Sequence, residues 1–243
     1  MFNKLTNNHA KELAKLHQKK FREKYKKTVV EGVRLIDQLN DYEIIFNELI
    51  ILNTSGFNIS QYSAKQIFIA SQNQMKKITV TKTPQNIVAV IDTIPIPVKQ
   101  TEFLLYLDGI SDPGNMGTIF RTATAAGVSG IILSPDCCEI YNPKVIRASL
   151  GSVFYLPSET HDHNWLKSFQ TSIIATTLEE SINLFELEKP ANLMLVIGSE
   201  AFGVSKEILK IANQKVKIPI PGNIESINAA VAAGIAIYHF INK

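Results

Sequence analysis

The chain has 243 residues and a formal net charge of +3, and 45% of its residues are hydrophobic while 19% are charged. This composition supplies enough apolar side chains for a folded core and excludes wholesale disorder. The two cysteines, Cys137 and Cys138, are adjacent, so they cannot join distant segments, and no Cys/His spacing resembles a zinc site. We therefore expect a protein of a reducing compartment, with one large domain or two small ones.

Neither export nor membrane insertion is indicated. The N-terminal stretch MFNKLTNNHAKELAK lacks the apolar region of a secretory signal. The longest apolar run, residues 229–238, has ten residues, whereas a bilayer span needs about 18 or more. We expect a soluble, cytoplasmic protein that does not bind membranes.

Charge is distributed unevenly along the chain. Residues 1–99 contain 15 Lys and Arg against eight Asp and Glu, whereas residues 100–243 contain 10 against 14. A basic N-terminal part favours contact with a polyanion such as a nucleic acid. The alternative is that these lysines only solvate a helix.

The N-terminal part reads as a small α/β domain. Residues 9–27 are rich in lysine and carry a weak apolar stripe, which predicts a basic helix. Short apolar runs then alternate with helical stretches, and we predict a domain over residues 1–95. Pro95 and Pro97 favour an extended chain, so we place a linker at residues 96–101.

The remaining residues, 102–243, show a regular alternation of strands and helices. Continuous apolar runs predict buried parallel strands at 103–107, 130–133, 172–175, 193–197 and 216–219. Helical patterns lie at 115–126, 142–151, 165–169, 205–212 and 226–240. This alternation predicts one domain with a parallel sheet covered on both faces.

In such a sheet ligands bind at the carboxyl ends of the strands, and three loops stand out there. The first, residues 107–121, contains three glycines and leads through Asn115 to Arg121 on a helix. The planar fork of an Arg matches a phosphate, although a surface Arg at a helix start is the simpler interpretation. The loop is neither a GxGxxG nor a Walker loop, so it does not indicate a dinucleotide or ATP.

The second and third loops also carry polar side chains. Gly198 ends a strand, where backbone can approach a ligand, and Glu200 follows near a helix start. In the third loop Ser226 is a candidate helix cap, and Asn228 lies in the first turn of the expected helix. Each feature alone has a purely structural alternative, such as a carboxylate beside a helix dipole.

Histidine, the usual general base, is missing from these loops. His161 and His163 have a spacing seen in metal pairs, but no third ligand is evident and a solvated loop is favoured. We expect no metal site.

Taken together, the three loops resemble the motifs of a known family. LDGISDPGNMGTIFRTATAAGV, VIGSEAFGVS and IPIPGNIESINAAVAAGIA, supported by YNPKVIRASLGSVF, resemble the SpoU/TrmH-type RNA ribose 2′-O-methyltransferases of the SPOUT class over residues 102–243. The departures are Ala201, Ile220 and Ile227, of which the two isoleucines nearly conserve volume. KYKKTVVEGVRLIDQL is similar to a substrate-binding domain that shares its fold with some ribosomal proteins.

This resemblance implies a fold, a cofactor and site residues. The fold is an α/β parallel sheet with a trefoil knot, assembled as a homodimer with the active site at the interface, and the cofactor is S-adenosylmethionine. The family's functional residues fall here on Asn115, Arg121, Glu200, Ser226 and Asn228. The implied cofactor-binding residues are Thr176, Gly198, Ile218, Ile220 and Ile227.

The resemblance also implies roles. Arg121 would bind the RNA phosphate and take part in removing the ribose proton, although an Arg holds its own proton tightly and we favour the phosphate role. Asn115 would orient Arg121 or the ribose, Glu200 would hold the arginine, and Ser226 and Asn228 would shape the third loop.

The expected activity is methylation of a ribose 2′-hydroxyl, and the two-domain layout favours ribosomal RNA over tRNA. Three alternatives remain open. They are a tRNA ribose 2′-O-methyltransferase, a non-catalytic RNA-binding or ribosome-assembly protein with the same fold, and a metabolic α/β enzyme whose basic half is only solvated surface.

Overall fold

The chain divides into two compact units. The computed structural model describes residues 2–52, 58–81, 85–99, 103–168 and 172–241. The first unit comprises Met1–Ile94 and Tyr141–Phe154, and the second comprises Pro95–Ile140 and Tyr155–Lys243. The predicted linker and the start of the second domain include residues 100–102, which lie outside the described residues.

Residues 141–154 group with the first unit, whereas the sequence placed them in the second domain. Gly151 shows the physical reason. Its φ is +80°, and a Cβ there would lie 2.7 Å from Leu39 and 3.2 Å from Leu35. The segment therefore packs directly on the helix that carries these leucines.

The first unit has a mixed five-stranded sheet in the order β1-β4-β3-β5-β2, in which β5 runs antiparallel to both its neighbours. Its strands are β1 (Asn3–Lys4), β2 (Lys27–Glu31), β3 (Phe46–Ile51), β4 (Ala64–Ile69) and β5 (Ile87–Asp92). Its helices are α1 (Asn7–Lys15), α2 (Lys19–Tyr25), α3 (Val33–Asp41), α4 (Gln72–Ile78) and α6 (Pro143–Ala148), with short 3-10 turns at Ile59–Gln61 and Ser152–Phe154.

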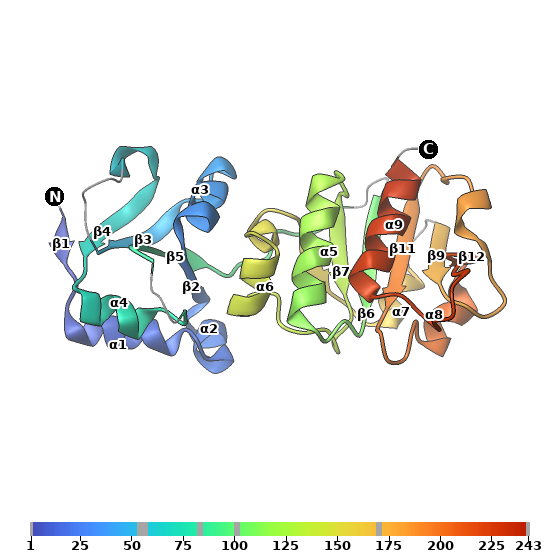
Figure 1. Ribbon diagram of the computed structural model, residues 1–243, viewed down its shortest axis with the longest axis horizontal. Coiled ribbons are helices and arrows are strands. Elements are labelled where there is room, and N and C mark those ends of the chain that lie inside the picture. The colour runs from blue at the N-terminus through green and yellow to red at the C-terminus, as the bar shows by residue number, and fades with distance from the viewer. Residues whose placement is uncertain (1, 53–57, 82–84, 100–102, 169–171, 242–243) are drawn as a thin grey trace. The chain divides into compact units, whose positions relative to one another are not determined.

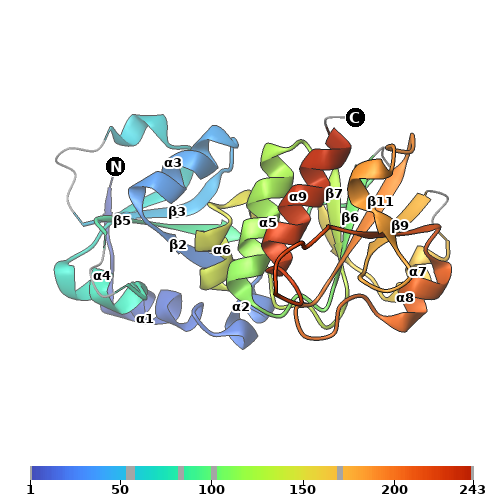
Figure 2. The ribbon, with the colours of Figure 1, turned by 45° about the vertical axis from the view of Figure 1, so that its right-hand side comes forward.

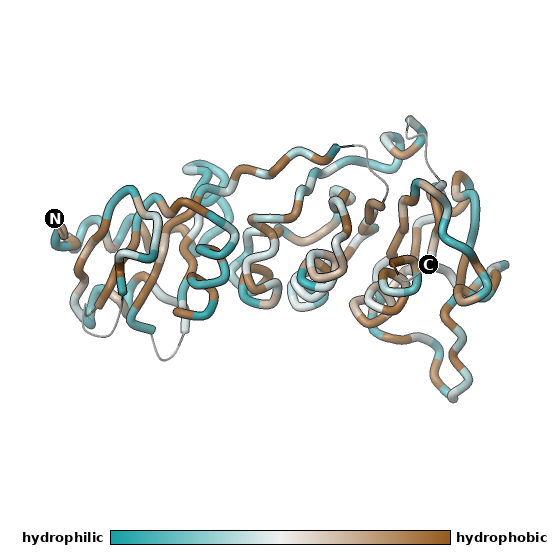
Figure 3. Tube along the Cα trace, turned by 90° about the horizontal axis from the view of Figure 1, so that it is seen from above, coloured by the Kyte–Doolittle hydropathy of each residue, from teal (hydrophilic) through white to brown (hydrophobic). Residues whose placement is uncertain are grey.

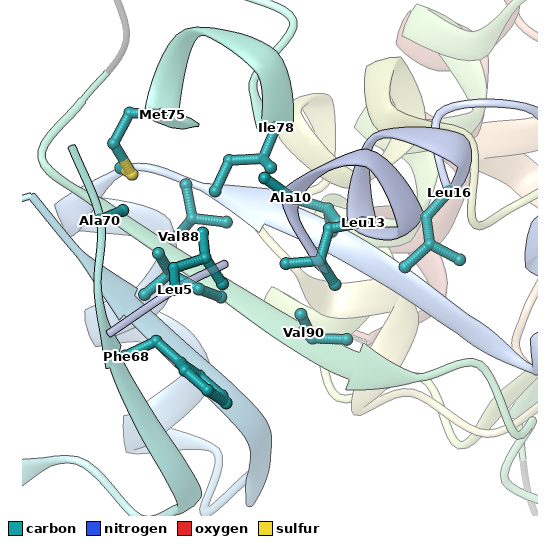
Figure 4. Close-up of a cluster of buried hydrophobic side chains, with 12 residues drawn as sticks. Leu5, Ala10, Leu13, Leu16, Phe68, Ala70, Met75, Ile78, Val88 and Val90 are labelled. Atoms are coloured by element: carbon teal, nitrogen blue, oxygen red, sulfur yellow. The ribbon is translucent and has the colours of Figure 1, made fainter. Parts of the chain in front are cut away.

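Helices α1 and α4 close one core of this unit. Figure 4 shows Ala10 and Leu13 of α1 and Met75 and Ile78 of α4 pointing toward Val88 on β5. The predicted basic helix 9–27 is broken into α1 and α2. The buried Arg22 guanidinium explains the break, because it donates hydrogen bonds to the carbonyls of Leu16 and His17 at 2.9 and 2.7 Å.

The second unit has a seven-stranded sheet in the order β10-β12-β9-β11-β6-β7-β8, and every pair in it is parallel (Figure 1). Its strands are β6 (Phe103–Asp108), β7 (Gly130–Leu133), β8 (Ser158–Thr160), β9 (Ser172–Thr176), β10 (Ile182–Asn183), β11 (Leu193–Gly198) and β12 (Gln214–Lys217). Its helices are α5 (Pro113–Ala125), α7 (His163–Leu166), α8 (Lys206–Ile211) and α9 (Ala229–Ile241), with a 3-10 turn at Leu184–Glu186.

Both faces of the central strands are covered, which is why the buried interior of these strands is continuously apolar. Leu104 and Tyr106 of β6 lie in a cluster with Leu166 of α7 and Ile208 of α8. Phe103, which points to the other face, contacts Phe240 of α9, and Figures 1 and 2 show α5 and α9 side by side. Figure 3 shows hydrophobic stretches of the trace in both units.

All five predicted strands are present in the sheet, but it also contains β8 and β10, which the sequence did not predict, and the strand expected at 216–219 is β12 (Gln214–Lys217). Three details of the helices differ as well. Helix α5 begins at Pro113, with Asp112 as its N-cap, so Asn115 lies inside the helix rather than opening it. Helix α9 begins at Ala229, three residues after the predicted start. The predicted helical piece 165–169 is α7, which begins and ends earlier, and Phe169 lies outside the described residues.

The knot implied by the resemblance stays a prediction. Within the described residues, every helix is too short or too polar to cross a bilayer.

Candidate active site

The three polar loops meet because β6 and β11 are neighbours in the sheet. Gly198, at the end of β11, pairs with Asp108, at the end of β6. The Asp108 carboxylate accepts a hydrogen bond from the backbone N–H of Ser205 at 2.7 Å, which ties the first loop to the second. The loop before α9 joins them through side chains.

Asn115, Glu200 and Asn228 form one hydrogen-bonded group, which we call the amide–carboxylate cluster. Glu200 Oε1 accepts from Asn115 Nδ2 at 2.9 Å and from Asn228 Nδ2 at 2.6 Å. Asn228 Nδ2 also donates to Asn115 Oδ1 at 3.0 Å. The cluster thus brings together one predicted residue from each of the three loops.

The cluster also organises the start of α9. Asn228 Oδ1 accepts from the backbone N–H groups of Ala230 and Val231 at 3.0 and 3.2 Å, and Glu200 Oε1 accepts from Ala229 N at 3.4 Å. Asn228 is therefore the N-cap, and the prediction that Ser226 caps this helix is wrong. A carboxylate beside the N-terminus of a helix is stabilising because it faces the positive end of the helix dipole.

Arg121 stands apart from this cluster. It is exposed on α5, six residues beyond Asn115, or about 9 Å along the helix axis. Within the described part of the chain, no hydrogen-bond or ion-pair partner of its guanidinium is found. Glu200 Oε1 accepts from the amides of Asn115 and Asn228 and not from Arg121, so the expected role of Glu200 in holding Arg121 stays a prediction.

All five expected cofactor-binding residues line one pocket of about 400 Å³, which we call the Ile218 pocket. It contains Ile218, Ile220 and Ile227 from the third loop, with Gly198 and Thr176 from the strand ends. Thr176 Oγ1 donates a hydrogen bond to the backbone carbonyl of Val196 at 3.0 Å. Glu200 and Ser226 also line this pocket, so the amide–carboxylate cluster adjoins it.

A second pocket of about 470 Å³ lies on the other side of the loop that carries Glu200, and we call it the acidic pocket. Asp108, Asp112, Asp136 and Glu200 line it. Four carboxylates give it a negative potential at neutral pH, so a phosphate is disfavoured there. Asn115 lines this pocket as well.

Gly198 is required by its own loop rather than by a ligand. An added Cβ would lie 2.1 Å from the carbonyl carbon of Gly203 and 2.3 Å from Val204 N. A side chain at Gly198 would therefore displace the turn formed by residues 199–203.

Three residues that hold the loops escaped the sequence analysis. Asp108 binds Ser205 N, Asp112 caps α5 through Asn115 N at 2.8 Å, and Ser134 Oγ accepts from Gly109 N at 2.9 Å. Asp108 and Ser134 each directly follow an apolar stretch of a buried strand, and that position is the signal that could have identified them.

The nucleophilic and titratable groups nearby have structural roles. Burial raises the pKa of Cys137 and raises that of Cys138 to about 11, so both thiols are protonated at neutral pH. His161 bonds Glu159 at 2.7 Å and holds the pKa of that carboxyl below its usual range, while its ring stacks on Trp165. Among the described residues, no group of three or more His, Cys, Asp or Glu side chains is placed to hold a metal ion.

Family models match both parts of the chain. Residues 102–238 match the SpoU rRNA Methylase family, and residues 7–89 match the MRM3-like substrate binding domain.

Individual proteins are similar over most of the length. The 23S rRNA (guanosine(2553)-2′-O)-methyltransferase RlmP of Bacillus subtilis is 29% identical over 96% of both chains. The 23S rRNA (uridine(2479)-2′-O)-methyltransferase of Streptomyces viridochromogenes is 28% identical over 74% of this chain and 68% of its own. The AdoMet-bound rRNA methyltransferase from Sinorhizobium meliloti superposes with a TM-score of 0.84 at 28% identity, covering 98% of this chain and 95% of that one.

Proposed function

This chain belongs to the SpoU rRNA methylase family, and we propose that it transfers a methyl group from S-adenosylmethionine to a ribose 2′-hydroxyl of ribosomal RNA. The expected family, the parallel-sheet α/β fold and the enzyme class, an RNA ribose 2′-O-methyltransferase, are confirmed. One observation in this chain carries the proposal. The amide–carboxylate cluster, which joins all three loops, adjoins a pocket lined by every residue expected to bind the cofactor.

The Ile218 pocket fits S-adenosylmethionine. Its volume of about 400 Å³ lies within the range of small-molecule sites, and such sites are largely apolar with a few polar groups. Ile218, Ile220 and Ile227 would cover the apolar parts of the cofactor, while Gly198 and Thr176 shape the wall beneath it. When bound, the cofactor supplies a methyl group on a positively charged sulfur that needs no further activation.

The amide–carboxylate cluster positions rather than reacts. Glu200 Oε1 accepts from two amides and one backbone N–H, and these three hydrogen bonds fix the orientation of the carboxylate. Its hydrogen bonds fix the turn 199–203 against the starts of α5 and α9. We infer that Asn115, Glu200 and Asn228 hold the cofactor loop and the substrate loop in one geometry.

Arg121 provides a positively charged side chain that is suited to bind the RNA backbone. An exposed guanidinium without a protein partner in the described residues is suited to a phosphate, which its planar fork binds through two parallel hydrogen bonds. We propose that Arg121 binds the phosphate beside the target ribose and lowers the cost of forming the ribose oxyanion as the hydroxyl loses its proton.

A second copy of the chain would complete the site. Arg121 lies on α5, away from the amide–carboxylate cluster of its own subunit. Next to α5, helix α9 presents Val231 and Tyr238, which are 53% and 45% exposed. We propose a homodimer in which Arg121 of one subunit serves the site of the other.

The first unit would bind the RNA through helix α2. Lys20 and Lys24 of α2 lie over the rings of Phe21 and Tyr25, and these rings are parallel with centroids 6.1 Å apart. Lysines interleaved with aromatic rings are typical of surfaces that bind single-stranded nucleic acid. Because the relatives described above act on 23S rRNA, we favour rRNA over tRNA and a cytoplasmic site of action.

The test has two parts. Purified protein is assayed for retained S-adenosylmethionine and for methyl transfer to total RNA from a strain lacking the gene, and 2′-O-methyl groups lost in that strain are mapped. We expect methyl incorporation into one rRNA nucleotide. Loss of a tRNA methyl group would change the substrate class, and a protein with neither cofactor nor transfer would overturn the proposal.

A further inference from the structure

Phe202 is the most exposed large hydrophobic side chain of the described residues, at 92%, well above the 50% of Phe185 in the same unit. Leaving an aromatic ring in water forgoes the stabilisation that burial provides. A single exposed ring is ordinary on a protein surface, so the place of Phe202 within the site carries the argument.

The backbone under this ring is well defined. Ser199 and Gly203 form an antiparallel bridge with N–H to O distances of 3.1 and 2.9 Å, and Phe202 N donates to Ser199 Oγ at 3.2 Å. Gly203 has φ +65°, which a larger residue rarely adopts. The tight turn also packs against Gly198, so it fixes the backbone position from which the ring projects.

Phe202 lies between the two pockets of the site. It lines both the Ile218 pocket and the acidic pocket, and it is two residues from Glu200 of the amide–carboxylate cluster. In the proposed reaction the ribose that receives the methyl group carries its base and the neighbouring nucleotides with it, so part of the RNA lies beside these pockets.

Charge differs between the two pockets beside this ring. Four carboxylates line the acidic pocket and disfavour a phosphate there, whereas Lys206 and Lys217 balance Glu179 and Glu200 around the Ile218 pocket. An exposed aromatic ring with lysines nearby is a combination that single-stranded nucleic acids bind. We propose that Phe202 stacks on a nucleobase of the RNA substrate, at or next to the methylated nucleotide, and this rests on the proposed function.

If the Phe202 ring stacks on a base, removing the ring should lower the affinity for RNA. Phe202→Ala should weaken RNA binding about 10- to 100-fold, because one base–aromatic stack contributes on that order. Phe202→Trp should keep most of the affinity, whereas Phe202→Leu, which is apolar but not planar, should lose most of it. The affinity for S-adenosylmethionine should stay within about threefold, since Ile218, Ile220 and Ile227 would cover the cofactor, whereas the Phe202 side chain is 92% exposed.

The experiment measures KM and kcat for methyl transfer to total rRNA from the deletion strain, with cofactor binding followed by calorimetry. The matched control is Phe185→Ala, which removes another exposed ring of the same unit. We expect KM for RNA to rise in Phe202→Ala and Phe202→Leu, but not in Phe202→Trp or the control.

The outcomes separate the two proposals. An inactive wild-type protein overturns the proposed function, whereas an active wild type with unchanged KM in Phe202→Ala overturns only the stacking role. Loss of the dimer in Phe202→Ala, seen by analytical ultracentrifugation, would mean that a second copy covers the ring and would also overturn it. A cofactor affinity that falls together with the RNA affinity would assign the ring to the cofactor instead.

Discussion

Asn228→Asp tests the amide–carboxylate cluster most directly, because it changes one half of the side chain and keeps the other. The retained Oδ1 still caps α9 by accepting from Ala230 N and Val231 N. The lost Nδ2 donates to Glu200 at 2.6 Å and to Asn115 at 3.0 Å. A carboxylate oxygen takes its place and faces the carboxylate of Glu200.

The magnitude follows from these contacts. Two exposed hydrogen bonds contribute about 0.5–1 kcal/mol each. Two carboxylates that move apart to roughly 5 Å still repel by about 1–3 kcal/mol, depending on how much water screens them. Because the cap is kept, we expect the second unit to lose about 2–5 kcal/mol of its free energy of unfolding at about pH 7.

The chain offers a convenient assay. Its single tryptophan, Trp165, lies in the same unit as the cluster, so its fluorescence during urea unfolding reports on that unit. The difference in free energy of unfolding between Asn228→Asp and wild type should shrink as the pH falls to about 4, because protonation of one carboxylate removes the repulsion. The double variant Asn228→Asp/Glu200→Gln should recover at least half of the loss, since the new amide at position 200 can donate to the new carboxylate at position 228.

Three outcomes would refute this reasoning. They are a single variant as stable as wild type, a double variant no more stable than the single one, and a loss that does not change with pH. Asn228→Ala provides the contrast, because it also removes the cap, which alone contributes about 1 kcal/mol.

Three further predictions concern the other parts of the site. Arg121→Ala should lower the rate of methyl transfer by about two to three orders of magnitude while leaving cofactor affinity and stability unchanged. Activity within about tenfold of wild type would remove Arg121 from the mechanism. Gly198→Ala should destabilise the second unit and abolish cofactor binding in calorimetry, since the added Cβ meets the backbone of the turn. Gly222→Ala, where a Cβ meets nothing within 4 Å, is the stability control, and equal unfolding in the two variants would contradict the prediction. Replacing Lys20 and Lys24 by Gln should weaken RNA binding and flatten its salt dependence by about 0.7 per lost phosphate contact. The control removes the same charge from exposed lysines of the second unit, Lys167 and Lys210. Equal slopes in both variants would return the α2 lysines to simple surface solvation.

The strands of the second unit could be predicted because burial on both faces leaves a simple signal. The expected runs 103–107 and 193–197 become β6 and β11 with one residue added at the carboxyl end of each. Helix starts were less predictable, since they depend on caps. Ser226 and Asn228 are both good N-caps by type. Which of them caps α9 is decided by Glu200, whose position depends on a strand pairing and not on local sequence.

The division into compact units differs from the predicted domain boundaries over residues 141–154, for a related reason. Val145, Ile146 and Phe154 are buried, as their apolar character predicts, but an apolar side chain does not specify which core it enters. The segment that carries them packs on α3 of the first unit, where Gly151 admits Leu39. Deleting the N-terminal residues would expose this packing surface, so charge variants test RNA binding more cleanly than truncation does.

The amide–carboxylate cluster shows where local sequence reasoning ends. Asn115 and Glu200 are 85 residues apart, and Asn115 and Asn228 are 113 apart. They meet because β11 inserts beside β6 rather than at the edge of the sheet, and because α9 returns to lie along α5. Spacing along the chain identified the polar residues at strand ends, since every parallel strand delivers its carboxyl end to the same edge. Spacing along the chain could not predict that Glu200 binds the amides of Asn115 and Asn228 rather than Arg121, because the partner of Glu200 depends on which face of α5 turns toward the loop. The same geometry leaves Arg121 exposed and unpaired within the described chain, and this free charge is what a bound phosphate requires.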